Sequence, residues 1–218
     1  MLWESIFQDI SIIKSILAVL PIEWDGKRSI LELKYADYNW RQMEWIGWYF
    51  EYKAKELLKD KFTEGDRFSS IIFNLKRTIN WDLKSSAVKT DSHKVILNDK
   101  SGMEMSIEKN GAHGEIIALC DVDYNDNART FQKWHAELKG EKSKYEKERE
   151  QRTSISRYRK TRAKLLEILL LVIKQGDLDS LLIMKQGRNS NGKPRAEKYM
   201  VDLEFITCYY ESIFFTET

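Results

Sequence analysis

The feature that most constrains this chain is a run of alternating polar and apolar residues between Ser70 and Ala87. The alternation is typical of β-strands, and it places Asp82 and Lys84 on one face. A chain reversal around Thr78 would put Asn74 opposite Asp82 in a hairpin. Opposed side chains have Cβ atoms about 5 Å apart, so these two residues could share a metal ion.

Length and composition predict one domain over residues 1–218. Hydrophobic residues make up 42% of the 218 residues, enough for a full core, and two prolines and ten glycines argue against disorder. The longest apolar run, Leu165 to Ile173, is too short to span a bilayer. The N-terminus has no signal-peptide pattern, and Cys120 and Cys208 lie in apolar surroundings without metal-ligand spacing. We therefore expect a cytoplasmic protein with buried free thiols and no membrane association.

The remaining patterns predict an α/β chain, in the α+β sense, with a mixed sheet of about four or five strands. Helices are predicted over 1–20, 40–60, 130–140 and 165–174. Strands are predicted over 93–98, 103–109, 181–184 and 200–206, with a turn at 99–102, and the apolar run over 115–122 predicts a buried strand. The sheet is expected to be flanked by the helices.

The net charge is only +2, so the chain as a whole does not indicate nucleic-acid binding, but its charge is unevenly distributed. Ten lysines and arginines occur with three glutamates between Lys142 and Lys164. A solvated charged helix is the plain interpretation of the mixed-sign part. The acid-free end contains Arg157, Arg159, Lys160 and Arg162, which we interpret as a surface that contacts phosphates.

A polar stretch from Lys185 to Tyr199 has nothing to bury. It carries side chains that read base edges in DNA, arginine for guanine and glutamine or asparagine for adenine. The candidate DNA-binding residues are Gln186, Arg188, Asn189, Ser190, Asn191, Lys193, Arg195 and Lys198. A hydrophilic surface loop explains the composition equally well, so the residues alone leave both interpretations open.

The run Trp81-Asp-Leu-Lys-Ser-Ser-Ala87 resembles the active site of the PD-(D/E)XK nucleases, in which an acid and a lysine two positions later lie at a strand end. Together with further stretches, including Gln186–Arg195, it resembles a type II restriction endonuclease over roughly Trp40 to Tyr199. The resemblance implies a restriction-endonuclease-like mixed central sheet flanked by helices. It also places DNA recognition at about 140–200.

The resemblance implies a Mg²⁺-dependent site that hydrolyses phosphodiester bonds. In such a site carboxylates hold the cation, which polarises the phosphate and lowers the pKa of bound water, and a lysine orients or deprotonates that water. Asp82 fits the metal ligand and Lys84 the water-orienting group. Glu44, on the helix before the hairpin, is implied to lie in or near the active site. Glu51 is a weaker candidate, and a solvated helix surface is the alternative for both.

The chain departs from the resemblance at Asn74, where the superfamily has an acid. An amide oxygen can ligate a metal but brings no negative charge, so Mg²⁺ should bind more weakly. Either Asp66 is the first acid, or Asn74 replaces an ancestral aspartate and impairs cleavage. The hairpin geometry favours the second interpretation, because it brings position 74 to Asp82.

Three functions follow from this resemblance. The first is a sequence-specific double-stranded DNA endonuclease of a prokaryotic restriction-modification system. It would act as a homodimer on a short palindrome and be paired with a DNA methyltransferase of the same specificity. The second is a repair or recombination nuclease of the same fold, and the third is a catalytically inactive DNA-binding protein. A metabolic enzyme is disfavoured, because the sequence has no phosphate-binding Gly-rich loop or nucleophile elbow.

Overall fold

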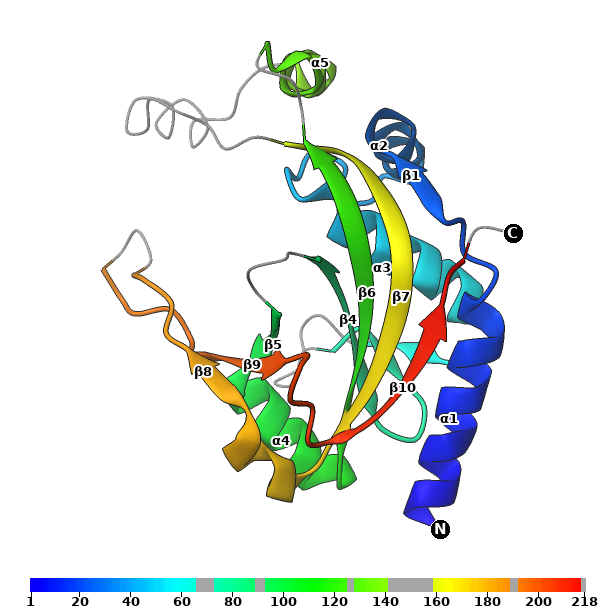
Figure 1. The fold of residues 1–218 in the computed structure, drawn as a ribbon, viewed down its shortest axis with the longest axis vertical. Helices are drawn as coiled ribbons and strands as arrows, with labels where there is room; N and C mark the ends of the chain where they lie inside the picture. Colours follow the sequence, from blue (N-terminus) through cyan, green and yellow to red (C-terminus); the bar gives the residue numbers. More distant parts are fainter. Residues whose placement is uncertain (66–72, 89–92, 125–127, 141–158, 189–191, 217–218) are drawn as a thin grey trace.

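The chain folds around a curled mixed β-sheet (Figure 1). A computed structural model describes residues 1–65, 73–88, 93–124, 128–140, 159–188 and 192–216. Within these residues seven strands form one sheet in the order β1-β7-β6-β4-β3-β2, with β10 also paired to β7. The strands are β1 (Glu23–Asp25), β2 (Thr63–Glu64), β3 (Leu75–Lys76), β4 (Asn80–Ala87), β6 (His113–Tyr124), β7 (Lys160–Ile173) and β10 (Tyr209–Phe214). Strands β4 and β6 are parallel and the other pairs are antiparallel, so the predicted mixed sheet is confirmed with more strands than expected.

A second, smaller sheet and the helices cover the two faces of the large sheet. The small sheet has the order β5-β9-β8, with β5 (Lys94–Asp99), β8 (Leu182–Met184) and β9 (Lys198–Asp202). The helices are α1 (Leu2–Leu17), α2 (Gly26–Tyr35), α3 (Trp45–Leu58), α4 (Lys100–Asn110), α5 (Thr130–Lys139) and the 3₁₀-helix η1 (Gln175–Ser180). In Figure 1, α4 and the small sheet lie on the concave side of the curved β6 and β7, and α1 to α3 lie on the other side.

Two apolar clusters form the core, one on each face of the large sheet. On the face covered by α1 to α3, Trp81, Ile116 and Leu170 pack with residues of those helices. On the face covered by α4 and the small sheet, Ile117 and Leu171 pack with residues of α4, β5 and β9. Alternate residues of β6 and β7 enter alternate clusters, as the two-residue period of a strand requires.

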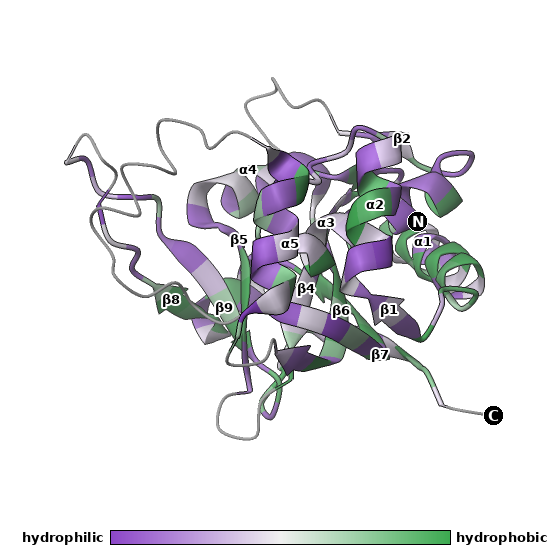
Figure 2. Ribbon diagram, turned by 90° about the horizontal axis from the view of Figure 1, so that it is seen from above, coloured by the Kyte–Doolittle hydropathy of each residue, from purple (hydrophilic) through white to green (hydrophobic). Residues whose placement is uncertain are grey.

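In Figure 2 the short strand β8 has hydrophobic colours although its side chains are partly exposed.

The predicted hairpin around Thr78 is confirmed. Leu75 pairs with Trp81 in the antiparallel β3–β4 ladder, and the backbone N–H of Asn74 donates to the carbonyl of Trp81. The turn is fixed by the buried carboxylate of Asp9 in α1. This carboxylate accepts hydrogen bonds from the Arg77 guanidinium (2.5 Å), the Thr78 backbone N–H (3.0 Å), the Thr78 hydroxyl (2.9 Å) and the Trp81 indole N–H (3.2 Å). Helix α1 therefore holds the strand that carries Asp82.

The predicted strand over 103–109 is wrong, because this segment belongs to helix α4. Met103 and Ile107 are one helical turn apart and both are buried, as one face of an amphipathic helix requires. Gly111 ends the helix with a φ of 82°, the left-handed conformation that glycine adopts most easily. The turn predicted at 99–102 contains the beginning of this helix, for which Asp99 is the N-cap residue.

The predicted helix over 165–174 is also wrong, because the segment is strand β7. From Ile168 to Ile173 the strand is buried on both faces. A strand buried in this way has a continuous apolar sequence, and periodicity alone cannot distinguish it from a buried helix.

Other predicted elements are confirmed with changed bounds. The buried strand predicted over 115–122 is β6, and the helix predicted over 130–140 is α5, which ends before Gly140. Helix α3 begins at Trp45 instead of residue 40, while helix α2 was not predicted. Cys120 and Cys208 are buried free thiols, as expected. Among the described residues no helix has the length and apolar character needed to cross a membrane.

Candidate metal site

Two neighbouring parallel strands bring three potential metal ligands together. In the β4–β6 ladder Asp82 pairs with Glu115, and Asn80 pairs with His113. Because side chains at positions two apart share a face, Asp82, His113 and Glu115 all point to the same side of the sheet. One ligand atom from each lies within 4.8 Å of the others, and the residues are 3%, 1% and 0% exposed, respectively. This buried cluster could hold a metal ion.

The Asp82 side chain is held in place by Asn74, which directly precedes β3, and by Asn98 in β5. Its Oδ1 accepts a hydrogen bond from the backbone N–H of Asn74 (3.1 Å), and its Oδ2 accepts one from the side-chain amide of Asn98. The Asn74 side chain contacts β4: its Oδ1 accepts a hydrogen bond from the backbone N–H of Leu83 at 2.7 Å. The predicted proximity of Asn74 and Asp82 is therefore confirmed, and the Asn74 amide oxygen is engaged with the backbone of β4.

The His113 imidazole is oriented by a hydroxyl behind it. Its Nδ1 lies 3.0 Å from Oγ of the buried Ser106 in α4, which also accepts a hydrogen bond from the Asn80 amide at 3.0 Å. The opposite nitrogen, Nε2, lies 3.7 Å from Oδ2 of Asp82 and 3.6 Å from Oε1 of Glu115. Among the described residues, neither Nε2 of His113 nor Oε2 of Glu115 has a hydrogen-bond partner. Buried polar atoms without partners are costly, and a cation between them would satisfy both.

Lys84 lies beside the cluster at its more exposed edge. Its side chain is 24% exposed, and its Nζ lies 3.8 Å from Oδ2 of Asp82. Burial lowers the pKa of this ammonium group, but the carboxylates of Asp82, Glu115, Glu51 and Asp99 outweigh the burial and raise the pKa above its usual value. Lys84 is therefore a protonated cation at neutral pH.

Burial has the opposite effect on the acid at the centre of the site. It raises the pKa of Asp82 above its usual range; the Lys84 ammonium opposes the rise, the Glu115 carboxylate adds to it, and His113 and the Asn74 backbone N–H oppose it. A divalent cation between the two carboxylates would favour their charged forms. The donor set of two carboxylates and one imidazole is typical of divalent-metal sites in proteins.

Glu44 is not brought to this cluster. It is the N-cap residue of α3, its side chain is 71% exposed, and its carboxylate accepts a hydrogen bond from Lys160 at 3.0 Å. In the β6–β7 ladder Lys160 lies opposite Tyr124, at the far end of β6, whereas Glu115 lies near the beginning of that strand. Glu51 bonds to the Tyr38 hydroxyl (2.5 Å) and to Lys55 (3.0 Å). The prediction for Asp66 falls outside the described residues.

The predicted DNA-reading loop forms an arm between β8 and β9, which projects from the small sheet in Figure 1. Arg188 and Arg195 are exposed on this arm, and Gln186 is partly buried. The Arg188 guanidinium donates to the carbonyl of Gly192 (2.8 Å), and the Arg195 N–H donates to the carbonyl of Gly187 (3.0 Å). Lys193 is exposed as well. The predictions for Asn189, Ser190 and Asn191 fall outside the described residues.

The base of this arm is attached to the metal-ligand cluster through the end of β5. Asn98, which donates to Asp82, also donates its backbone N–H to Oε1 of Glu115 at 3.2 Å. The next residue, Asp99, forms an ion pair with Lys198 at 3.2 Å, and the N–H of Lys100 donates to the carbonyl of Glu197 at 2.9 Å. The arm and the cluster are thus joined by contiguous backbone and side-chain contacts.

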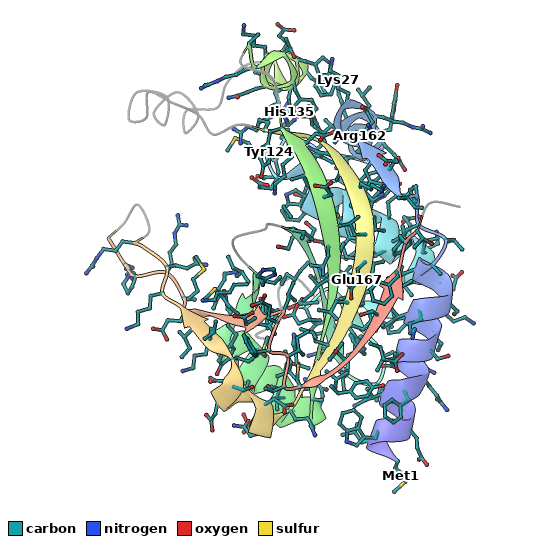
Figure 3. All side chains as sticks on the ribbon, viewed as in Figure 1. Met1, Lys27, Tyr124, His135, Arg162 and Glu167 are labelled. Carbon is teal, nitrogen blue, oxygen red and sulfur yellow. The ribbon has the colours of Figure 1, made fainter. Side chains whose placement is uncertain are left out.

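The basic residues predicted to contact phosphates lie at the other end of the large sheet. Figure 3 shows Arg162 near Tyr124, at the end of β6 opposite to α4. Arg162 pairs with Glu23 at 2.8 Å, and the Arg159 guanidinium contacts the sulfur of Met43. Lys160 pairs with Glu44, as described above, and Arg157 falls outside the described residues. These basic groups are partly neutralised within the fold, and their contact with DNA stays a prediction.

Sequence reasoning missed His113 and Glu115. The run from Glu115 onward was interpreted as an apolar strand, and its first residue was given no chemical role. A signal was present, because a histidine and a glutamate two positions apart occupy the same face of a strand that is otherwise apolar. Their proximity to Asp82 depends on the parallel pairing of β4 with β6, which the sequence pattern did not specify.

Comparisons with known proteins assign neither a family nor a function to this chain. A scan against protein-family models, a search of curated proteins and a search of solved structures each found no match. The fold and the site therefore define the class of protein as an α+β chain, with a curled mixed sheet flanked by helices and a buried cluster that could hold a metal ion.

Proposed function

We propose that this chain is a divalent-metal-dependent endonuclease that hydrolyses phosphodiester bonds in double-stranded DNA. The observation that carries the proposal is the position of Glu115 beside Asp82, on the face that also presents Lys84. The sequence resemblance to the PD-(D/E)XK nucleases lacks an acid at Asn74. Glu115 supplies that second negative charge from the neighbouring strand, so the substitution at position 74 does not leave the site with a single carboxylate.

The described residues fit separate roles in phosphodiester hydrolysis. Asp82, Glu115 and His113 would hold the cation. When bound, a divalent cation lowers the pKa of its water and neutralises charge on the phosphate. Because Nζ of Lys84 lies 3.8 Å from Oδ2 of Asp82, we assign Lys84 to orienting the attacking water and stabilising the charge that develops on phosphate oxygens.

The arm between β8 and β9 supports DNA as the substrate. It presents Arg188 and Arg195, which are suited to guanine edges and phosphates, and among its described residues there is no exposed large hydrophobic side chain. Its base contacts Asn98 and Asp99 at the edge of the cluster. A nuclease whose recognition arm is attached to its active site can couple base reading to cleavage, and we therefore propose a sequence-specific enzyme with the restriction-endonuclease-like fold.

The proposal extends to the partners that such an enzyme requires. A short palindromic site has two-fold symmetry, so a homodimer is the matching assembly. A DNA methyltransferase of the same specificity would protect the host genome. Mg²⁺ is the cation expected from the sequence resemblance.

Cleavage of phage DNA of diverse sequence tests the proposal. The whole chain is incubated with the DNA in the presence of Mg²⁺, Mn²⁺ or EDTA, beside Lys84→Met and the matched control Lys94→Met, whose lysine is exposed on β5. We expect discrete fragments with the wild-type chain and with Lys94→Met, no fragments in EDTA, and a loss of rate of about 100-fold or more with Lys84→Met.

Other outcomes separate the alternatives. A continuous smear would indicate a nuclease of the same fold without sequence specificity, as expected for some repair enzymes. Binding to particular DNA fragments without cleavage under any cation would indicate a DNA-binding protein and would refute the catalytic proposal.

A further inference from the structure

We infer that the Asp82–His113–Glu115 site selects a transition-metal ion, of which Mn²⁺ is the test case, over Mg²⁺. The inference takes its site from the proposed function, but it concerns ion binding and does not require DNA cleavage. Three independent features of the cluster lead to it: the imidazole ligand, the spacing of the donor atoms and the burial of the site.

The first feature is the orientation of His113. Oγ of Ser106 is a suitable acceptor for an Nδ1–H, and the Asn80 amide occupies another position on the same oxygen. With the proton on Nδ1, the lone pair of Nε2 is directed toward two carboxylate oxygens, 3.6 and 3.7 Å away. At these distances neither oxygen forms a hydrogen bond with Nε2, and in this tautomer a cation between the three atoms would give Nε2 a partner. Ligating histidines are commonly fixed in this way by a hydrogen bond to their second nitrogen.

The second feature is the chemistry and spacing of the donors. Imidazole nitrogen is a ligand of first-row transition-metal ions, whose affinities for such sites rise from Mn²⁺ to Cu²⁺, whereas Mg²⁺ prefers oxygen ligands and near-ideal octahedral geometry. Donors 3.6 to 3.7 Å apart subtend an angle of about 120° at an ion about 2.1 Å from each. Adjacent ligands of octahedral Mg²⁺ would be about 3.0 Å apart. The spacing is therefore closer to that of a tetrahedral or distorted site.

The third feature is burial. His113 is 1% exposed and Glu115 is 0% exposed, so an ion bound by both has little room for a hydration shell. Mg²⁺ dehydrates reluctantly and usually keeps several waters in protein sites. An ion that accepts nitrogen and exchanges water for protein ligands more readily is favoured in this position.

Metal binding to the whole chain without DNA tests the inference. Calorimetric titration with MnCl₂ and with MgCl₂ is compared for the wild-type chain, His113→Asn and the control His93→Asn, whose histidine is 42% exposed and contacts Glu204. We expect Mn²⁺ to bind the wild-type chain at least about 100-fold more tightly than Mg²⁺. His113→Asn should weaken Mn²⁺ binding by about 100-fold and change Mg²⁺ binding by less than about threefold. His93→Asn should leave both affinities unchanged.

A second variant keeps the test decisive if His113→Asn does not fold. Ser106→Ala retains all three ligands but removes the hydroxyl that orients the imidazole, and it should weaken Mn²⁺ binding by about tenfold. Equal affinities for the two ions, or a Mn²⁺ preference that survives in His113→Asn, would overturn the inference.

The outcomes also separate this inference from the proposed function. Selective Mn²⁺ binding without DNA cleavage would support the inference and refute the nuclease. Specific cleavage with no preference between the ions would do the reverse.

Discussion

Glu115→Gln should make the metal-free protein more stable, although it removes a proposed functional group. In the metal-free protein the Glu115 carboxylate is fully buried near Asp82, and its Oε2 has no hydrogen-bond partner among the described residues. Ligand oxygens of the two carboxylates lie within 4.8 Å of each other, and two negative charges at about that separation repel by about 3 kcal/mol at an effective dielectric constant of about 20. The lost attraction between Glu115 and the Lys84 ammonium opposes this gain, so the free energy of unfolding should rise by about 1–2 kcal/mol.

Urea unfolding at pH 8 in EDTA measures this change. In a thermal melt the same rise of about 1–2 kcal/mol corresponds to a Tm increase of about 2–8 °C for a chain of this length. Addition of MnCl₂ should reverse the order, because only the wild-type chain gains binding free energy from the ion.

Glu51→Gln is the matched control for the same chemical change. The Glu51 carboxylate bonds to the Tyr38 hydroxyl and to Lys55, so its loss should destabilise the protein by about 1–2 kcal/mol. If Glu115→Gln also destabilises the metal-free protein, then the carboxylate is a satisfied structural group, and the reasoning that assigns it to a metal is refuted.

The remaining predictions concern the thiols, the hairpin and position 74. Burial raises the pKa of the Cys120 thiol to about 12 and that of the Cys208 thiol to about 11, so neither should react with a thiol reagent at pH 8 until denaturant is added; rapid reaction of the native protein would contradict this. Asp9→Ala should lower the free energy of unfolding in urea by about 3 kcal/mol, because it leaves buried hydrogen-bond donors of the hairpin without their acceptor; a loss below about 1 kcal/mol would show that Asp9 does not hold the hairpin. Asn74→Asp should tighten divalent-ion binding about tenfold, since it adds a charge beside Asp82, but cleavage that occurs only in this variant would show that Glu115 does not replace the missing acid.

The hairpin could be predicted from sequence because its determinants are local. Alternation fixed the faces of β4, and the reversal at Thr78 fixed the register that brings Asn74 to Asp82. The same local reasoning failed for β7, whose apolar run is continuous because both of its faces are buried. It also failed for α4, because Met103, Met105 and Ile107 alternate as in a strand although only Met103 and Ile107 are buried. Local patterns therefore predicted the hairpin, but they could not identify a strand that is buried on both faces, or a helix whose apolar residues also fit the two-residue period of a strand.

The metal-ligand cluster could be predicted only in part, for a different physical reason. Asp82 and Lys84 lie on one strand, so their common face follows from the two-residue period. Glu115 and His113 come to them through a parallel pairing, which requires a crossover through β5 and α4. That crossover could not be predicted while α4 was interpreted as a strand. The error in one secondary-structure element thus concealed two of the three ligands.

The central claim is that Asp82, His113 and Glu115 together hold one divalent cation. The most direct test is an anomalous difference map from crystals of the whole chain grown with Mn²⁺. The account predicts an anomalous peak about 2.0–2.3 Å from Oδ2 of Asp82, Nε2 of His113 and a carboxylate oxygen of Glu115. A chain that binds Mn²⁺ in solution but shows its anomalous peak elsewhere, or a map with no peak between these three side chains, would contradict it.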